Sequence, residues 1–196
     1  ARIEQLAAEE LPNPDDDLPL VVAAGRLAPE KGYEVLIEAH GLARARVPHR
    51  LMIFGQGPER ERLEALIHEL RLEDTASLAG YVLNHYPWMR RASLLCRSSY
   101  HEGMPLVLIE ALSLGTPVVA TRCSEGVADL LRDGELGALV EPGSPPALAE
   151  GIATHLERPE EKRARAVRAG NSARETWSIV TCAARHAEII ESAMRR

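Results

Sequence analysis

Two carboxylates lie eight residues apart in residues 101–117, which read HEGMPLVLIEALSLGTP. Glu110 falls in an apolar run, where burial of an ionised side chain is costly unless a partner donates hydrogen bonds to it. Pro105 is typical of a first helical turn, which predicts a helix with Glu102 and Gly103 at its N-terminus and Glu110 inside it. Both carboxylates then face one cleft. A vicinal diol such as a ribose would satisfy Glu110, and an Arg or Lys of the fold is the alternative partner.

Two cations lie close together in residues 25–32, which read GRLAPEKG. Gly25 permits a tight turn, and Arg26 and Lys31 stand near the start of a helix that we predict over residues 31–46. Two flexible bases beside the positive end of a helix suit a diphosphate. A turn with two solvated bases is the alternative interpretation.

The turn at residues 54–59, FGQGPE, contains only part of a dinucleotide-binding fingerprint. Its G-x-G pair is followed by Arg60 where the fingerprint has a third glycine, and Pro58 fits an ordinary first helical turn. No acidic residue at a following strand end takes the ribose-binding role cleanly. The pattern therefore disfavours a nicotinamide dinucleotide.

Six short apolar runs must position these loops, and they alternate with segments that are compatible with helices. The runs lie at residues 19–25, 50–57, 76–82, 92–98, 116–123 and 137–143. Strands that are apolar on both faces indicate a parallel sheet covered by helices on both sides. We predict an α/β, Rossmann-like, doubly wound sheet of about six strands, which binds ligands beyond the carboxyl ends of its strands. Residues 1–17 are interpreted as a linker and residues 18–196 as one domain.

Composition excludes several other classes of protein. A formal net charge of −6 argues against nucleic acid as a partner, and we interpret the Arg-rich residues 158–174 as the solvated face of a helix. Three widely spaced cysteines suggest neither a disulfide framework nor a zinc site. No apolar run is long enough to span a bilayer, and residues 1–17 lack the apolar core of a signal peptide. We expect a cytoplasmic protein, with peripheral attachment to a membrane as the alternative for the full-length protein.

A metal site is not predicted. Asp15, Asp16 and Asp17 resemble a metal-binding D-x-D, but they precede the first strand, whereas a metal–diphosphate site belongs after a strand. The seven histidines show no ligand spacing. Arg26 and Lys31 already supply the positive charge that Mg²⁺ would otherwise provide.

Residues 102–121, EGMPLVLIEALSLGTPVVAT, resemble the E-x7-E signature of the retaining GT-B glycosyltransferases of family four. Four further segments support the resemblance, and one of them is the turn FGQGPER at residues 54–60. The loop GRLAPEKG resembles the diphosphate-binding G-R-L-x-x-x-K-G of that family, and GYV at residues 80–82 resembles its base-lining segment. Residues 175–190 are similar to its terminal Trp-containing helices, so the resemblance covers roughly residues 18–195.

The resemblance implies a role for each matching residue. Arg26 and Lys31 would hold the donor diphosphate and offset the charge of the leaving nucleotide, Glu102 would contact the donor sugar, and Glu110 would bind the ribose hydroxyls. Glu102, Arg26 and Lys31 would be the catalytic residues of a metal-independent transfer. The implied donor-binding residues are Gly25, Arg26, Lys31, Gly55, Tyr81, Val82, His101, Glu102, Gly103, Met104, Pro105, Leu106 and Glu110.

The sequence also departs from the family at two places. His101 and Met104 replace the aromatic residues often found beside the E-G pair, and residues 123–126 read CSEG where the family often has G-G-x-x-E. These departures affect contacts to the sugar. They leave Arg26, Lys31 and the two carboxylates in place.

The resemblance implies that the chain is one half of a GT-B fold, the donor-binding half, and that the N-terminal acceptor domain is absent. The implied function is transfer of a hexose from a UDP-, GDP- or ADP-sugar to a saccharide or lipid-linked acceptor in the synthesis of cell-surface polysaccharide or glycoconjugate. We expect the isolated domain to have little activity, because catalysis needs the acceptor held against the donor. A non-catalytic module that binds a nucleotide sugar or another nucleotide is the alternative.

Overall fold

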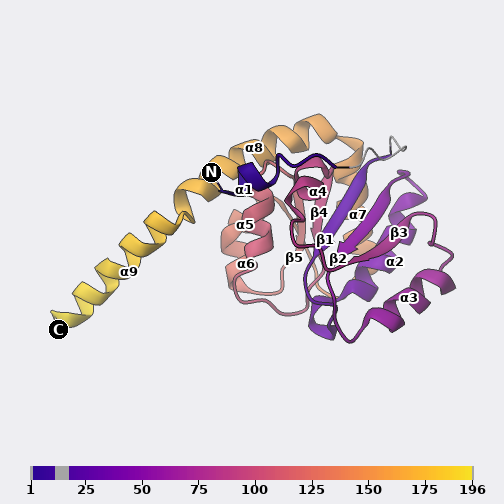
Figure 1. Cartoon of the computed structure of the whole chain (residues 1–196), viewed down its shortest axis with the longest axis horizontal. Helices are drawn as coiled ribbons and strands as arrows, with labels where there is room; N and C mark the ends of the chain where they lie inside the picture. Colours follow the sequence, from indigo (N-terminus) through magenta and orange to yellow (C-terminus); the bar gives the residue numbers. More distant parts are fainter. Residues whose placement is uncertain (1, 12–17, 196) are drawn as a thin grey trace.

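A computed structural model describes residues 2–11 and 18–195 (Figure 1). In this part of the chain, six parallel strands form one sheet in the order β3-β2-β1-β4-β5-β6. The strands are β1 (Leu20–Ala24), β2 (Arg50–Phe54), β3 (Ala76–Gly80), β4 (Leu94–Arg97), β5 (Val118–Thr121) and β6 (Ala138–Val140). Each strand lies within one of the six predicted runs, so the predicted doubly wound sheet is confirmed.

Helices connect the strands, as expected for parallel pairing. The α-helices are α1 (Arg2–Leu6), α2 (Tyr33–Arg44), α3 (Arg60–Glu69), α4 (Tyr86–Arg91), α5 (Leu106–Ser113), α6 (Glu125–Leu130), α7 (Pro145–Glu157), α8 (Pro159–Thr176) and α9 (Ile179–Met194). Two short 3₁₀-helices, η1 (Pro29–Lys31) and η2 (Arg132–Gly134), lie in the loops after β1 and α6. Asp15, Asp16 and Asp17, which we considered as a metal motif, lie outside the described residues.

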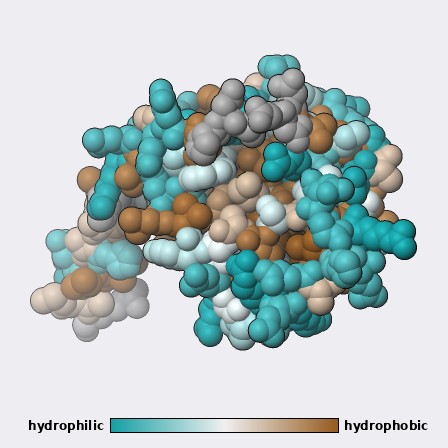
Figure 2. Space-filling model, turned by 45° about the vertical axis from the view of Figure 1, so that its right-hand side comes forward, coloured by the Kyte–Doolittle hydropathy of each residue, from teal (hydrophilic) through white to brown (hydrophobic). Residues whose placement is uncertain are grey.

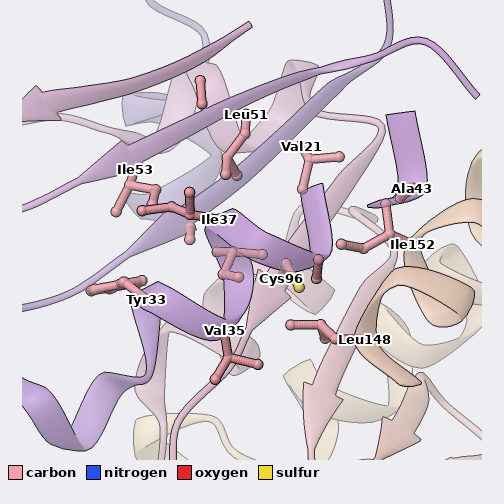
Figure 3. Packing of buried hydrophobic residues seen from close by; sticks show 14 of the residues in the cluster. Val21, Tyr33, Val35, Ile37, Ala43, Leu51, Ile53, Cys96, Leu148 and Ile152 are labelled. Carbon is pink, nitrogen blue, oxygen red and sulfur yellow. The ribbon is translucent and has the colours of Figure 1, made fainter. Parts of the chain in front are cut away.

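The two faces of the sheet have separate cores, because successive side chains of a strand point to opposite faces. Val21 of β1 belongs to the core under α2, α3 and α7, part of which is drawn in Figure 3, whereas Val22 belongs to the core under α4, α5, α6 and α8. Both valines are almost completely buried. This two-sided burial explains why the strands read as continuous apolar runs.

The sheet opens between its two central strands. β1 pairs with β2 over five residue pairs, but it pairs with β4 over only two, Val21 with Leu94 and Val22 with Leu95. The strand order also reverses direction here, since β2 and β3 lie on one side of β1 and β4 to β6 on the other. Such a switch point is where open parallel sheets place their ligands.

The last two helices differ in how they pack. The Arg-rich stretch forms α8, as predicted, and it buries small residues such as Ala169 and Gly170 in the core around α5. Helix α9 extends away from the body in Figure 1, and Figure 2 shows hydrophobic side chains among hydrophilic ones on it. In the described part of the chain, no helix is both long and apolar enough to cross a bilayer.

Candidate functional site

A cavity of about 370 Å³ lies at the carboxyl ends of β1, β2 and β3. Five of the predicted donor-binding residues line it together, and they are Gly25, Arg26, Gly55, Tyr81 and Val82. The lining also includes Phe54 and Gln56 of the FGQGPE turn and His85, which were not among the predicted donor-binding residues. The three loops that carry these residues are far apart in the sequence and meet only because the strands are parallel and adjacent.

The loop that carries Lys31 is fixed against the end of β4. Ser98 Oγ donates a hydrogen bond to the Lys31 carbonyl at 2.9 Å, and the Tyr100 N–H donates to the Glu30 carbonyl at 2.9 Å. Gly32 has a φ of 58°, and a Cβ there would lie 2.4 Å from the Ser98 carbonyl oxygen, so no other residue fits this contact without a shift. This docking brings Lys31 beside the loop that carries Glu102.

Glu102 accepts four hydrogen bonds through a single oxygen, Oε1. Lys31 Nζ lies at 3.0 Å, Arg97 Nε at 2.7 Å and Ser99 Oγ at 2.7 Å, and Arg97 Nη2 also donates to the same oxygen. Burial favours the neutral acid, but the positive charge of Arg97 and the hydrogen bonds from Ser99, Lys31 and Arg97 outweigh it, so the pKa of Glu102 is lowered. The site therefore holds an ionised carboxylate beside its cations.

Arg97 is a site residue that the sequence patterns missed. It ends β4 and is only 5% exposed, and its Nη1 donates a hydrogen bond to the Ala24 carbonyl of β1 at 2.7 Å. A Cβ on Gly25 would lie 2.8 Å from Arg97 Nη1, so Gly25 leaves room for this guanidinium. The informative signal was a charged residue in the apolar run 92–98, since an arginine is rarely buried without a partner.

Glu110 has a protein partner that is neither Arg nor Lys among the described residues. The hydroxyl of Tyr86, in α4, donates a hydrogen bond to Glu110 Oε1 at 2.9 Å, and His85 Nε2 lies 3.8 Å from Oε2. Burial and the carboxylate raise the pKa of Tyr86 to about 12, which keeps the hydroxyl protonated and able to donate. Because His85 also lines the cavity, Glu110 lies directly behind the cavity wall.

The other predicted site residues lie on the loop between β4 and α5. His101, Gly103, Met104 and Leu106 are exposed, whereas Pro105 is buried. Pro105 is the N-cap of α5 and not a residue of its first turn as predicted, so Glu102 and Gly103 lie in the loop before the helix. A Cβ on Gly103 would have no neighbour within 4 Å, so the backbone is open to a ligand there. Gly126, in the segment that departs from the family, packs against the Gly103 carbonyl.

Comparison with known proteins identifies the family of this fold and site. Residues 6–173 match the family described as glycosyl transferases group 1. The chain belongs to this family. This chain is 35% identical over 155 residues to an N-acetylgalactosaminyltransferase of Campylobacter jejuni that, by its name, acts on a diphospho-undecaprenol acceptor. It is 37% identical over 143 residues to LpsE, a lipopolysaccharide core biosynthesis glycosyltransferase of Rhizobium meliloti.

These alignments cover 79% and 72% of the group 1 chain but only 41% and 39% of the two relatives. Among solved structures, HepE of Anabaena in complex with UDP superposes with a TM-score of 0.81 at 28% identity. That superposition covers 88% of this chain and 48% of HepE. The chain thus spans about two fifths to one half of the length of these proteins, and its fold matches about one half of HepE.

Proposed function

We propose that this chain is the donor-binding half of a retaining, family-four glycosyltransferase that transfers a hexose from a nucleotide-diphosphate sugar. The observation that carries the proposal is the pairing of Lys31 with Glu102, which Arg97 joins to Ala24 in the wall of the cavity. Arg26 and the strand-end glycines line the same cavity. Two cations and closely approaching backbone suit a diphosphate, and a carboxylate suits sugar hydroxyls. HepE, which has been solved with UDP and with UDP-glucose, supports a uridine nucleotide as the first donor to test.

In this proposal the nucleotide lies in the cavity at the ends of β1 to β3. Tyr81 and Val82 would line the base, and Glu110, behind His85, would accept hydrogen bonds from the ribose hydroxyls. Arg26 and Lys31 would hold the diphosphate and neutralise the negative charge that develops on it as the sugar leaves. The two side chains would make the transfer metal-independent.

Glu102 would contact the transferred sugar together with the backbone of residues 103–106. We assign it a role in positioning and electrostatic stabilisation rather than as a covalent nucleophile. All four of its hydrogen-bond donors bind Oε1, which leaves Oε2 without a donor among the described residues. That oxygen is available to a sugar hydroxyl.

None of the predicted site residues of this chain is assigned to binding the acceptor. The Campylobacter and Rhizobium relatives, by name, act on a lipid-linked saccharide and in lipopolysaccharide core synthesis, which supports a saccharide or lipid-linked acceptor here. Catalysis needs acceptor and donor held in contact. We therefore expect this chain alone to bind donor with little turnover.

Isothermal titration calorimetry of this chain with UDP, GDP and ADP tests the proposal. We expect saturable binding of at least one of them, and weaker binding of the same nucleotide by Lys31→Met. Arg168→Met, on the exposed side of α8, removes one positive charge elsewhere and should bind like the parent chain. No binding of any of the three, or a preference for NAD, would support the alternative of a module with another nucleotide ligand.

A further inference from the structure

Arg97 bridges the opening of the sheet. Its Nη1 donates to the Ala24 carbonyl at the end of β1, and its Nε and Nη2 donate to Glu102 in the loop after β4. β1 and β4 stop pairing after Val22 and Leu95, so the Ala24 carbonyl has no donor on the backbone of β4. The guanidinium takes the place of the missing ladder bond and joins the two halves of the sheet at the switch point.

More donors surround the Oε1 atom of Glu102 than it can accept strong hydrogen bonds from. A carboxylate oxygen offers about two lone-pair sites, yet Lys31, Ser99 and two nitrogens of Arg97 all donate to it. Arg97 is buried and fixed at its other end by Ala24, whereas Lys31 ends in a flexible stem and is 17% exposed. Lys31 is therefore the donor that a competing anion removes most easily.

We infer that Arg97 is a positioning residue that keeps Glu102 charged and in place, so that Lys31 can move from Glu102 to the donor diphosphate. The inference rests on the proposed function, since it assigns Lys31 to the diphosphate. Without Arg97, Lys31 is the one cation left on Glu102 among its described donors. Moving Lys31 to the ligand would then leave a half-buried carboxylate without a positive partner, which is costly.

A double-mutant cycle measures this coupling through UDP affinity. We expect Arg97→Met to weaken UDP binding by about tenfold, the worth of a hydrogen bond to a charged group. Adding Glu102→Gln should restore most of that loss, because a neutral amide does not retain Lys31. An unspecific structural effect of Arg97→Met would persist in the double variant, and such persistence would overturn the inference. Arg168→Met is the matched charge control.

A second measurement needs no nucleotide and so separates this inference from the proposed function. Carboxyl-carbon NMR of the ligand-free chain follows the titration of Glu102. We expect Arg97→Met to raise the pKa of Glu102 more than Lys31→Met does, because the charge of Arg97 is the largest influence that lowers it. If the parent chain binds no nucleoside diphosphate, the proposed function fails, and this titration alone decides the role of Arg97.

Arg97→Lys is a second variant for the same measurements, to be used if Arg97→Met does not fold. A lysine keeps the charge but cannot bond Ala24 and Glu102 through separate nitrogens. We expect weaker UDP binding that Glu102→Gln restores, and a pKa of Glu102 above that of the parent chain. Unchanged UDP affinity together with an unchanged pKa in Arg97→Lys would show that Glu102 is placed without the bridge.

Discussion

Three carboxylate contacts govern the site: Lys31 and Arg97 with Glu102, and Tyr86 with Glu110. The first two are ion pairs at low exposure, which hold Glu102 in one place and in one charge state. The third is a hydrogen bond from a neutral hydroxyl. It satisfies one oxygen of Glu110 and leaves the negative charge available to a ligand.

The first prediction concerns Glu110→Gln. The amide oxygen can still accept from Tyr86, so we expect the free energy of unfolding to change little. Affinity for the nucleoside diphosphate should fall by about 1.5–3 kcal/mol, because hydrogen bonds from the ribose would lose their charged acceptor. Calorimetry and chemical denaturation of the same variant measure the two effects.

Tyr86→Phe is the matched control for this prediction. It removes the partner that the fold provides and leaves the carboxylate, so its nucleotide affinity should stay within about twofold of the parent chain, a difference smaller than the worth of one hydrogen bond. If Glu110→Gln instead unfolds the chain and leaves the affinity of the folded fraction unchanged, the role of Glu110 is structural.

The second prediction concerns the pH dependence of stability through His155 of α7. Burial lowers the pKa of this histidine from 6.5 to about 4, although its Nδ1 donates a hydrogen bond to the Gly151 carbonyl at 2.8 Å. The unfolded chain therefore binds the proton first, so the stabilisation is present above pH 6.5 and is lost as the pH falls toward 4. The loss is at most about 3 kcal/mol, from 1.36 kcal/mol per pKa unit.

We expect His155→Gln to lose less unfolding free energy than the parent chain between pH 6.5 and pH 4, measured by chemical denaturation. Glutamine keeps a donor but does not titrate. His186→Gln on α9 is the control, because His186 donates to the Cys182 carbonyl with the same spacing but is exposed. If the unfolding free energy of His155→Gln fell with pH as steeply as that of the parent chain, His155 would not be the source of the pH dependence.

The sequence predicted part of these contacts. Arg26 and Lys31 follow one strand and Glu102 another, and the rule that strand ends meet in a parallel sheet predicts their proximity. No spacing rule connects Glu110 with Tyr86, which is 24 residues away in another helix, because the contact depends on where α4 packs. Arg97, like Glu110, is a charged residue in an apolar run of the sequence, and such a residue is rarely buried without a partner.

Helix α5, which carries Glu110, owes its position to close packing against α8. Gly170 of α8 is buried, and a Cβ there would lie 2.2 Å from the Leu112 carbonyl oxygen of α5. That oxygen belongs to the backbone and cannot move without moving the helix. The small residues of α8 thus fix the depth at which α5 lies on the sheet.

The third prediction is that Gly170→Ala destabilises the chain. Alanine favours a helix over glycine by up to about 1 kcal/mol, but overpacking of a core costs about 1–3 kcal/mol. Since the clash is with backbone, we expect overpacking to win by about 1 kcal/mol or more in chemical denaturation.

Gly41→Ala in α2 is the matched control for Gly170. Its Cβ would meet the Leu72 side chain at 3.5 Å, an ordinary contact. This variant should gain up to about 1 kcal/mol of stability from helix propensity. A stabilising effect of both substitutions would show that α5 and α8 can separate without cost.

The elements themselves were predictable because both faces of the central strands β1, β4 and β5 are buried, which makes these strands stand out as apolar runs. The boundaries of the strands were less predictable. The run at residues 50–57 extends past the end of β2 at Phe54, since Gly55 and Gly57 belong to the FGQGPE turn. The packing depth of α5 was not predictable, because small residues such as Gly170 appear in a stretch dominated by charge.

At the scale of the molecule, residues 2–11 and 18–195 form a packed sheet domain from which the helix α9 projects (Figure 1). None of the described side chains of α9 from residue 180 onward is buried, and Val180, Ile189 and Met194 are among its exposed apolar residues. Trp177, just before it, packs on the core. The domain therefore ends its tertiary packing at about Trp177.

The fourth prediction is that removal of residues 179–196 changes the free energy of unfolding by less than about 1 kcal/mol, since few buried contacts are lost. Chemical denaturation of the shortened chain, which retains Trp177, measures this. UDP affinity should also be unchanged. A loss of several kcal/mol would show that α9 packs against the domain in solution.

The opening between β1 and β4 also divides the specificity of the proposed reaction between two stretches of the chain. Residues that would line the base follow β3, whereas those that would contact the sugar follow β4, as does Glu110, which would bind the ribose common to these donors. Substitutions at Tyr81 and at His101 fall on different sides of the opening. In such a protein, the preference for the base and the preference for the sugar can evolve independently, because changing one leaves the backbone that supports the other intact.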